Sequence, residues 1–378
     1  GAQVGPYRTM VEAVAMRTHG LGGDSEVHFT SQGLIAGVTL GPKRLLPVSL
    51  LAVEAGEVVH RALDAQMRRS IVGEHDGRFV RAVPGQEVEG LVPRDLALLE
   101  RIGTDVWPLG DVLRNRVEQG ALARLVARGL VQVAGVTPSD ASHVAGHLSA
   151  WDSAAAHKAL ALFGRKRGGS GLRFCPEPES LAKIIIDQLT DQTALALLET
   201  AFAEESPAFD LPPEILARHV LMQRGLSGHR GVLRIDAGLN LPVVGLGASA
   251  ATYYPAVGKR LGSEMILPDH AHVANAIGAV VGRVIMRESG TVTVPHEGVF
   301  RVHLANGPQD FPNAERALAE AETALTETAR GRAQSAGAAQ IECHVTRDIR
   351  MAEIEGREVF VEAALTVEAS GRPRVAAG

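Results

Sequence analysis

Apolar side chains recur every three to four residues along several stretches, and this spacing predicts amphipathic helices. One such stretch covers residues 48–70 and a second covers residues 152–163. Thr137-Pro138-Ser139-Asp140 begins another helix, because proline suits the first turn and Ser or Asp caps free N–H groups; we expect it to run towards Trp151. The longest predicted helix, residues 178–204, places on one side Leu181, Ile184, Ile185, Leu189, Ala196 and Leu197.

Near the N-terminus the pattern alternates instead, which is typical of strands. Val11, Ala13 and Ala15 alternate with other residues, and a similar pattern resumes at Glu26. The glycine-rich segment 20–25 separates the two stretches. The pattern therefore predicts a hairpin with a bend rich in glycine.

Strands and helices alternate between residues 232 and 287. The pattern predicts strands at 232–235, 242–246 and 265–267, with helices at 249–261 and 270–287. This alternation indicates an α/β domain. One side of the last helix carries small residues four apart, namely Ala274, Gly278 and Gly282.

Two further segments differ from that α/β pattern. Residues 76–135 predict a short strand, three helices and another strand, an order that resembles a winged helix and indicates an inserted module. Its predicted elements are 78–83, 93–103, 108–115, 119–128 and 129–133. Residues 291–378 predict an α+β tail domain with strands near 291–303, 340–352 and 357–368 around a helix at 313–336. Gly168–Gly171 predicts a flexible joint.

Composition narrows the class of protein. The chain has 378 residues, 46% of them hydrophobic, which suffices for two or three domains. A net charge of −5 without clustered basic residues gives no reason to expect nucleic-acid binding. Cys175 and Cys343 share no CxxC spacing, which argues against a disulfide framework or zinc site and favours the cytoplasm. The longest apolar stretch is interrupted by Asn275 and Arg283, so we expect no membrane span.

Two glycine-rich segments are candidates for ligand binding. The first, Gly20-Leu21-Gly22-Gly23-Asp24-Ser25, has backbone N–H groups that can converge around a phosphate, with the Ser25 hydroxyl as a further donor. The alternative is a tight hairpin bend. The second, Gly245-Leu246-Gly247-Ala248-Ser249, joins a strand to a helix, where a nucleotide can lie against the helix N-terminus. It lacks the third glycine of a dinucleotide fingerprint, since position 250 is alanine, and the alternative is an ordinary strand–helix turn.

Histidines supply a third candidate. His143 and His147 lie four residues apart on the predicted helix, one turn after Asp140, and this geometry can bind a metal ion. The alternative is a pair of structural or solvated histidines. His270 lies at the start of the last predicted helix of the α/β region, and it is interpreted as a helix-start residue or as a ligand contact.

Taken together, the two glycine-rich segments resemble the phosphate hairpin and the adenosine turn of actin-like ATPases, which are far apart in sequence and occur in this order. The chain resembles the hydantoinase/oxoprolinase family, A-type subunit, over about residues 8–290. The matching segments are Thr9–Val14 with Thr18–Ser25, Thr137–Val144 with Trp151-Asp152, Val243–Ala250 and Pro268–Ala279. Four features depart from the family pattern. Ala15 stands where an acidic residue is usual, a GPACYG-like segment is reduced to Gly41-Pro42, residues 76–135 look like an insertion, and no Asp-x-Gly-Gly-Thr lobe precedes Gly1.

The resemblance implies an α/β fold of the actin-like (ribonuclease H-like) class, formed by residues 1–75 and 136–290. It implies an ATP-dependent hydrolase that opens cyclic amides, with ATP and Mg²⁺ as cofactors, a B-type subunit as partner, and homo-oligomerisation. The implied nucleotide-binding residues are Gly20, Gly22, Gly23, Asp24, Ser25, Gly245, Gly247, Ala248 and Ser249, with Asp24 as the metal contact. We expect a C-terminal portion of such an enzyme that is inactive alone. An ATP-dependent carboxylase subunit and a non-catalytic assembly module are the alternatives.

Overall fold

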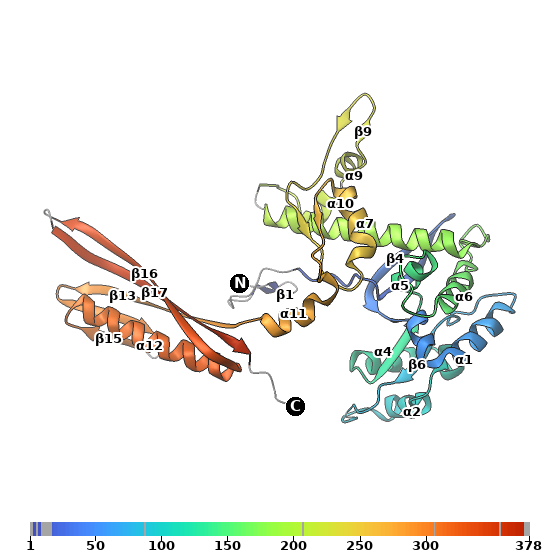
Figure 1. Cartoon of the computed structure of the whole chain (residues 1–378), viewed down its shortest axis with the longest axis horizontal. Coiled ribbons are helices and arrows are strands. Elements are labelled where there is room, and N and C mark those ends of the chain that lie inside the picture. The colour runs from blue at the N-terminus through green and yellow to red at the C-terminus, as the bar shows by residue number, and fades with distance from the viewer. Residues whose placement is uncertain are drawn as a thin grey trace. The chain divides into compact units, whose positions relative to one another are not determined.

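The computed structural model describes residues 3–4, 7–8, 17–86, 88–205, 208–305, 307–354 and 357–373. The chain divides into two compact units, Gly1–His272 and Val273–Gly378, hereafter the N-terminal unit and the tail unit. Both combine helices with small sheets, so the fold is mixed α/β (Figure 1). The strand predicted at residues 11–15 lies outside the described residues.

An antiparallel hairpin is the first well-defined element of the N-terminal unit. Strands β3 (Ser25–Gln32) and β4 (Ile35–Arg44) pair from end to end, after the short β1 (Gln3–Val4) and β2 (Tyr7–Arg8). The Gln192 amide fastens β4 to helix α7, because it accepts a hydrogen bond from the Leu40 N–H (2.9 Å) and donates one to the Leu40 carbonyl (3.0 Å).

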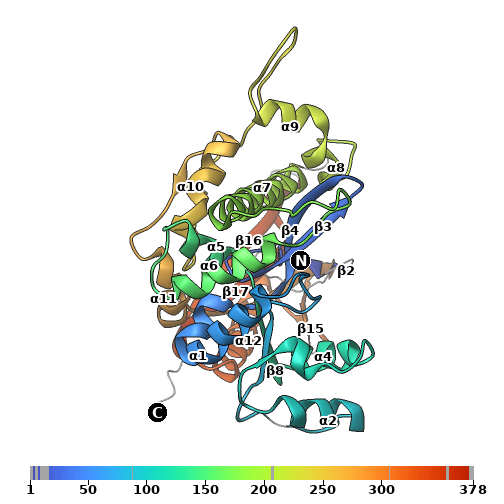
Figure 2. The same cartoon turned by 90° about the vertical axis from the view of Figure 1, so that its right-hand side faces the viewer.

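Four helices contribute most of the main core of this unit. They are α1 (Val48–Met67), α5 (Pro138–Val144), α6 (Ser153–Gly164) and α7 (Pro178–Glu204). Helix α6 lies beside α1 and α5, and α5 lies beside α7 (Figure 2). The periodicity predicted α1, α6 and α7 correctly, and their apolar sides meet in this core.

Helix α5 is shorter than predicted. It ends at Val144, and Gly146 follows in the left-handed region with φ 75°. The predicted continuation to Trp151 is therefore wrong. The predicted cap is confirmed: the Thr137 hydroxyl accepts from the Asp140 N–H while the Asp140 carboxylate accepts from the Thr137 N–H.

The segment 76–135 contains the predicted strand, three helices and strand, together with a short strand at residues 107–108 that was not predicted. These are β6 (Phe79–Ala82), α2 (Pro93–Ile102), β7 (Trp107–Pro108), α3 (Leu109–Val112), α4 (Glu118–Ala127) and β8 (Val131–Gly135). Its sheet is continuous with the rest of the unit, because β8 also pairs in parallel with β5 (Leu46–Pro47). The neighbours Phe79 and Val80 belong to different cores: Phe79 packs in the main core, and Val80 packs with the helices of the segment.

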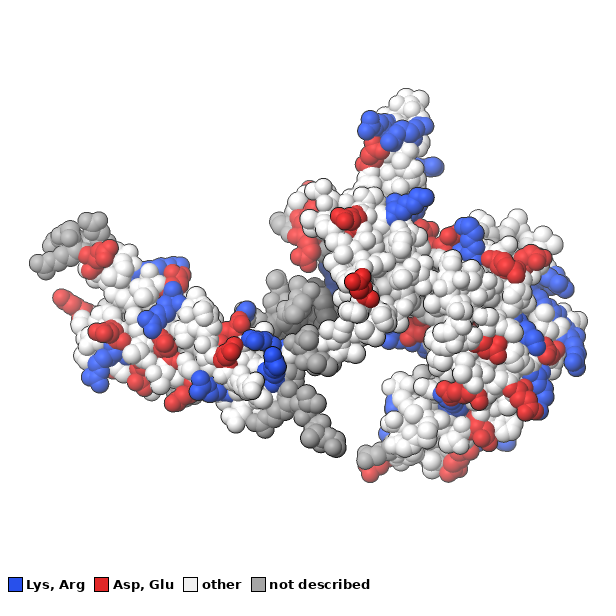
Figure 3. All heavy atoms as spheres, in the orientation of Figure 1, with Lys and Arg blue, Asp and Glu red and all other residues white. Residues whose placement is uncertain are grey.

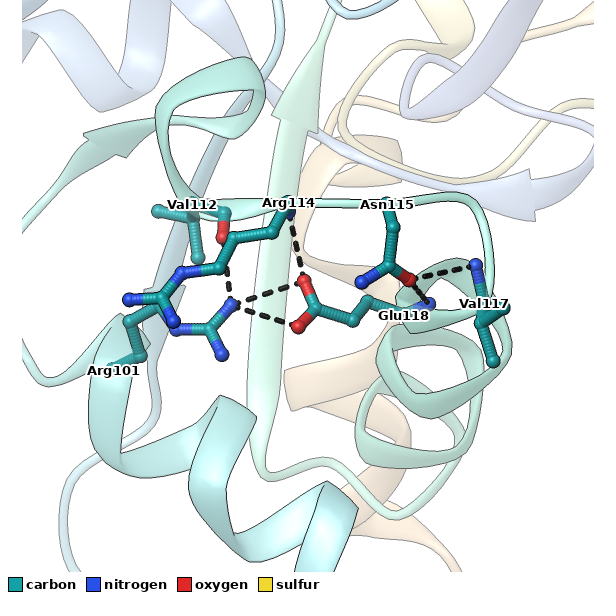
Figure 4. A network of polar contacts seen from close by, with 6 residues as sticks. All are labelled: Arg101, Val112, Arg114, Asn115, Val117 and Glu118. Atoms are coloured by element: carbon teal, nitrogen blue, oxygen red, sulfur yellow. Dashed lines mark hydrogen bonds and ion pairs between the residues drawn. The ribbon is translucent and has the colours of Figure 1, made fainter.

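A polar network fixes the helices of this segment to one another (Figure 4). The Arg101 guanidinium donates to both oxygens of Glu118 (3.0 Å each) and to the Val112 carbonyl (3.0 Å). The Arg114 N–H donates to the same carboxylate (2.8 Å). The backbone N–H of Arg114, followed by the Arg101 guanidinium, lowers the pKa of Glu118 against the opposing effect of its burial.

The rest of the N-terminal unit contains the predicted βαβ sequence. Helices α8 (Pro213–Arg218) and α9 (Val220–Leu226) precede a small hairpin of β9 (His229–Arg230) and β10 (Arg234–Ile235). Strand β11 (Val243–Val244) then leads into α10 (Ala250–Leu261), and β12 (Met265–Ile266) pairs with β11 in parallel. The predicted strand–turn–helix–strand order is confirmed here.

The predicted joint at Gly168–Gly171 is a packed turn. The Gly169 N–H donates to the Ser31 hydroxyl (3.0 Å), and a Cβ on Gly169 would lie 2.0 Å from the Gly33 carbonyl oxygen. The glycines therefore permit close contact with the tip of the β3–β4 hairpin rather than flexibility.

The tail unit is an antiparallel sheet with one helix packed on it. The strands are β13 (Val284–His296), β14 (Val299–Leu304), β15 (Gly307–Phe311), β16 (Ala338–Ile354) and β17 (Arg357–Pro373), in the order β15-β14-β13-β17-β16. Helix α12 (Ala314–Ser335) covers one face and buries a row of alanines together with Leu325 against the sheet. Acidic and basic side chains are interspersed on the side of this unit seen in Figure 3.

The helix predicted at residues 270–287 is wrong in extent. A 3₁₀ turn (Ala271–Val273) and α11 (Ala274–Val281) occupy its first part, and β13 begins at Val284. The strand forms there because residues from Val284 onward pair with β17. This partner lies far away in sequence and outweighs the local helical spacing.

Candidate functional site

The first glycine-rich segment forms a tight turn immediately before β3. The Gly22 N–H donates to the Ser25 hydroxyl (2.8 Å), and the Ser25 N–H donates to the Gly22 carbonyl (3.1 Å). Ser25 is buried. Its hydroxyl therefore holds the turn, and the Gly22 N–H is already used.

Gly20 has a packing role. A Cβ on Gly20 would lie 2.6 Å from the Pro42 carbonyl oxygen, and one on Gly41 would lie 2.0 Å from the Gly20 carbonyl oxygen. These two backbones touch, so glycine at position 20 is required by the approach of β4.

Gly23 lies where three segments that are distant in sequence converge. Its carbonyl accepts a hydrogen bond from the Ser139 N–H at the start of α5 (2.8 Å). A Cβ on Gly23 would lie 2.8 Å from the Ser139 hydroxyl oxygen and 3.3 Å from both the Cβ and the hydroxyl oxygen of Ser249. Within the described residues, the N–H groups of Gly23 and Asp24 donate to no acceptor. The bend thus meets the N-cap residue of α10, with two backbone donors available nearby.

The glycines of the second turn have different roles. A Cβ on Gly245 would lie 2.7 Å from the Leu267 side chain and 2.8 Å from the Tyr254 ring, so this glycine serves packing. Gly247 has φ 118°, and nothing lies within 4 Å of the position its Cβ would take. Ala248 is exposed. The open side of this turn is therefore at Gly247 and Ala248.

Sequence reasoning missed two residues of this region, Ser139 and Tyr253. Tyr253 is buried on α10, one turn after Ser249, with its ring 4.7 Å from that of Tyr254. Burial first, and then the neighbouring Tyr254 and Asp24, raise the pKa of Tyr253, so the phenol stays protonated. The i, i+4 spacing from Ser249 was the available signal for Tyr253; nothing local indicated that Ser139 faces Gly23.

Asp24 is the predicted metal contact. Its side chain is 39% exposed, and its carboxylate lies 3.4 Å from the Arg44 guanidinium. Among the described ranges, no three His, Cys, Asp or Glu side chains form a group that could hold a metal ion. One accessible carboxylate fits Mg²⁺ held mainly by phosphate oxygens and water, a common arrangement at nucleotide sites.

The histidine pair does not form a metal site. The Asp140 carboxylate is fully buried and accepts from the N–H groups of Val48, Ser49 and Thr137 and from the hydroxyls of Ser49 and Thr137. The rings of His143 and Trp151 stack at 5.0 Å, and His143 also bonds to the Ser139 carbonyl (2.8 Å) and accepts from the Trp151 N–H (3.1 Å). His147 lies beyond the end of α5 and is exposed. The metal-site interpretation is wrong, because both inner side chains are already satisfied by the protein.

A cavity of about 230 Å³ borders the bend. Its lining comes from the bend, β4, α7 and α8, and includes His19, Gly20, Leu21, Leu40, Gln192 and Arg218. Polar and apolar side chains both line this cavity, and the Arg218 guanidinium at its wall is already paired with Glu199.

No family model, no curated protein and no solved structure matches the chain. Across the described residues, no helix is both long enough and apolar enough to cross a membrane.

Proposed function

We propose that the chain forms part of an ATP-dependent hydrolase that opens cyclic amides, with the N-terminal unit acting as an actin-like nucleotide-binding lobe. The observation that carries the proposal is the contact of Gly23 with Ser249. Two glycine-rich segments separated by more than two hundred residues meet at this point. Their sequence motifs resemble those of the hydantoinase/oxoprolinase family.

The residues at this junction have distinct roles in the proposal. The N–H groups of Gly23 and Asp24, which have no acceptor among the described residues, orient phosphate oxygens, since backbone donors fixed in advance stabilise shifting negative charge. The open space at Gly247 and Ala248 receives the adenosine half. Asp24 contacts Mg²⁺ directly or through water. The nucleotide supplies a phosphoryl group that makes the amide carbon reactive towards water. Gly20, Ser25 and Gly245 support the backbone.

Two alternative functions make different predictions for this site. An ATP-dependent carboxylase subunit would use the same nucleotide contacts but couple turnover to bicarbonate. A non-catalytic assembly module would bind no nucleotide. Since the chain alone is expected to be inactive, ATP hydrolysis by the intact enzyme separates the amide hydrolase from the carboxylase: hydantoin or 5-oxoproline stimulates the first, and bicarbonate the second.

The direct test is calorimetric titration of residues 1–378 with ATP and Mg²⁺. We expect weak saturable binding, above the micromolar range, that is lost in Gly247→Leu because leucine would occupy the open space and strain the backbone. Lys259→Trp is the matched control, since Lys259 is exposed near the other end of α10. Binding that survives Gly247→Leu would remove the adenosine assignment. Absence of saturable binding at millimolar ATP would favour the assembly module.

A further inference from the structure

Strand β16 forms an outer edge of the tail-unit sheet. It is 17 residues long, and β17 is its only strand neighbour among the described residues. Its pairing with β17 is regular from Glu342 to Arg350, with bulges only on either side of that stretch. A long, straight edge with free backbone donors and acceptors readily pairs with another strand.

We propose that β16 pairs antiparallel with β16 of a second copy of this chain, about a two-fold axis at Thr346. Thr346 is the midpoint of the regular stretch from Glu342 to Arg350. Pairing would join two five-stranded sheets into one. The interface is isologous, so every contact occurs twice.

Charge complementarity selects this register. On the face away from α12, centring on Thr346 places Glu342 opposite the second copy's Arg350 and His344 opposite the second copy's Asp348. Opposite charges directly across antiparallel strands stabilise the pair, and like charges destabilise it. Glu342 and Arg350 already pair within their own chain with Arg283 (3.5 Å) and Glu362 (2.7 Å). His344 and Asp348 are exposed, and neither side chain forms a hydrogen bond or ion pair within the described residues. The symmetric pairing thus supplies partners for both.

Neighbouring registers are unfavourable. Centring on Val345 would place Glu342 opposite Asp348, two acids. Centring on Arg347 would place that residue opposite its own copy and His344 opposite Arg350. The register centred on Thr346 avoids both kinds of repulsion.

The other face of the strand is apolar near its end. Ile349 and Met351 are 43% and 48% exposed, although they lie on the same side of the strand as the core residue Val345. In the proposed register Ile349 faces the second copy's Cys343. Pairing therefore covers exposed apolar side chains, which adds to the backbone ladder. The proposed interface lies in the tail unit alone and is independent of the nucleotide site.

The first test uses charge reversal on the full chain, with molar mass measured by analytical ultracentrifugation. Glu342→Arg alone places arginine opposite Arg350 twice, and Arg350→Glu alone places two glutamates together twice. Each variant should dissociate more readily than the wild type, with a dissociation constant raised about tenfold or more. A mixture of the two variants places opposite charges at every pair, so it should recover the dimer as a heterodimer.

The second test is disulfide trapping in a Cys343→Ser background. Thr346→Cys should form a covalent dimer under mild oxidation, because residue 346 lies opposite itself. Thr366→Cys is the matched control: Thr366 pairs with Thr346 one strand further in. Two copies of residue 366 would lie three strand spacings apart, roughly 14 Å, which is too far for a disulfide.

A monomeric wild-type chain at high micromolar concentration would overturn the proposal. A dimer insensitive to both charge variants would also overturn it, since another surface would then hold the copies together. Equal trapping at positions 346 and 366 would indicate random collision and contradict the register.

Discussion

Replacing Gly23 by alanine tests how closely the bend packs between α5 and α10. The new Cβ would lie 2.8 Å from the Ser139 hydroxyl oxygen, closer than real contacts allow, and 3.3 Å from two atoms of Ser249. Both serines begin helices whose following residues are anchored in the core. The added methyl group must therefore displace the Ser139 hydroxyl and move Ser249 by a few tenths of an ångström.

The size of the effect follows from two opposing contributions. Forcing one methyl group into a packed site costs about 1–3 kcal/mol. Gly23 is not in the left-handed region, so alanine also restricts the unfolded chain and returns about 0.4–1 kcal/mol. We expect a net loss of about 1–2 kcal/mol, or roughly 2–8 °C in Tm for a unit of this size.

Tryptophan fluorescence during urea unfolding is the suitable assay. The chain has two tryptophans, Trp107 and Trp151, and both lie in the N-terminal unit. The signal therefore reports that unit alone. Adding Ser139→Ala to Gly23→Ala removes the nearest atom, and the double variant should recover about 1 kcal/mol relative to additivity.

A neutral Gly23→Ala, or additive effects of the two substitutions, would refute the packing described here. The same measurement also constrains nucleotide experiments. A larger residue at position 23 would both lower the stability of the N-terminal unit and block the bend. An ATP-binding measurement on Gly23→Val is therefore paired with an unfolding curve of the same variant.

Three further predictions concern the N-terminal unit. Replacing residues 84–129 by Asn-Gly joins β6 to β8 through a two-residue turn, and unfolding followed by Trp151 fluorescence should stay cooperative. Deleting residues 76–135 also removes Phe79 from the main core and should give a product that unfolds without cooperativity. Equal behaviour of the two deletions would contradict the shared core. Burial, followed by the charge of Arg78, lowers the pKa of Lys166 from 10.5 to about 8. Between pH 8 and 10.5 the unfolded state therefore binds more protons than the folded state, so the free energy of unfolding should rise with pH in that range. Lys166→Met should abolish this rise, and a rise that persists in the variant would belong to another titrating group. The pKa of Glu118 is lowered from 4.5, so its contribution is present above that pH and lost as pH falls below it; Glu118→Gln should be less stable at pH 7 and lose this acid dependence, as followed by circular dichroism.

Local patterns predicted the elements whose partners are close in sequence or whose apolar side is long. Helix α7 was predicted with its observed ends because its apolar residues repeat over 27 residues. The sequence pattern wrongly predicted a helix for residues 282–287. Their strand partner, β17, lies near the C-terminus of the chain, so no pattern in the neighbouring sequence indicates the pairing. The contact of Gly23 with Ser139 and Ser249 also joins residues that are far apart in sequence, so no local pattern predicts it. Sequence indicated which glycines were unusual, but not which of them face one another.

The buried carboxylate of Asp140 restricts which amino acids can occupy position 140. Five donors from three residues surround its two oxygens, and no cation balances it among the described residues. Burial raises the pKa of Asp140, while these donors oppose that rise. Asparagine would turn an NH₂ group towards donors, glutamate is one methylene too long, and alanine would leave the donors unsatisfied. Six of the seven residues of α5 are buried, so substitutions along the whole helix are restricted, and position 140 at the junction with α1 is the most restricted of them.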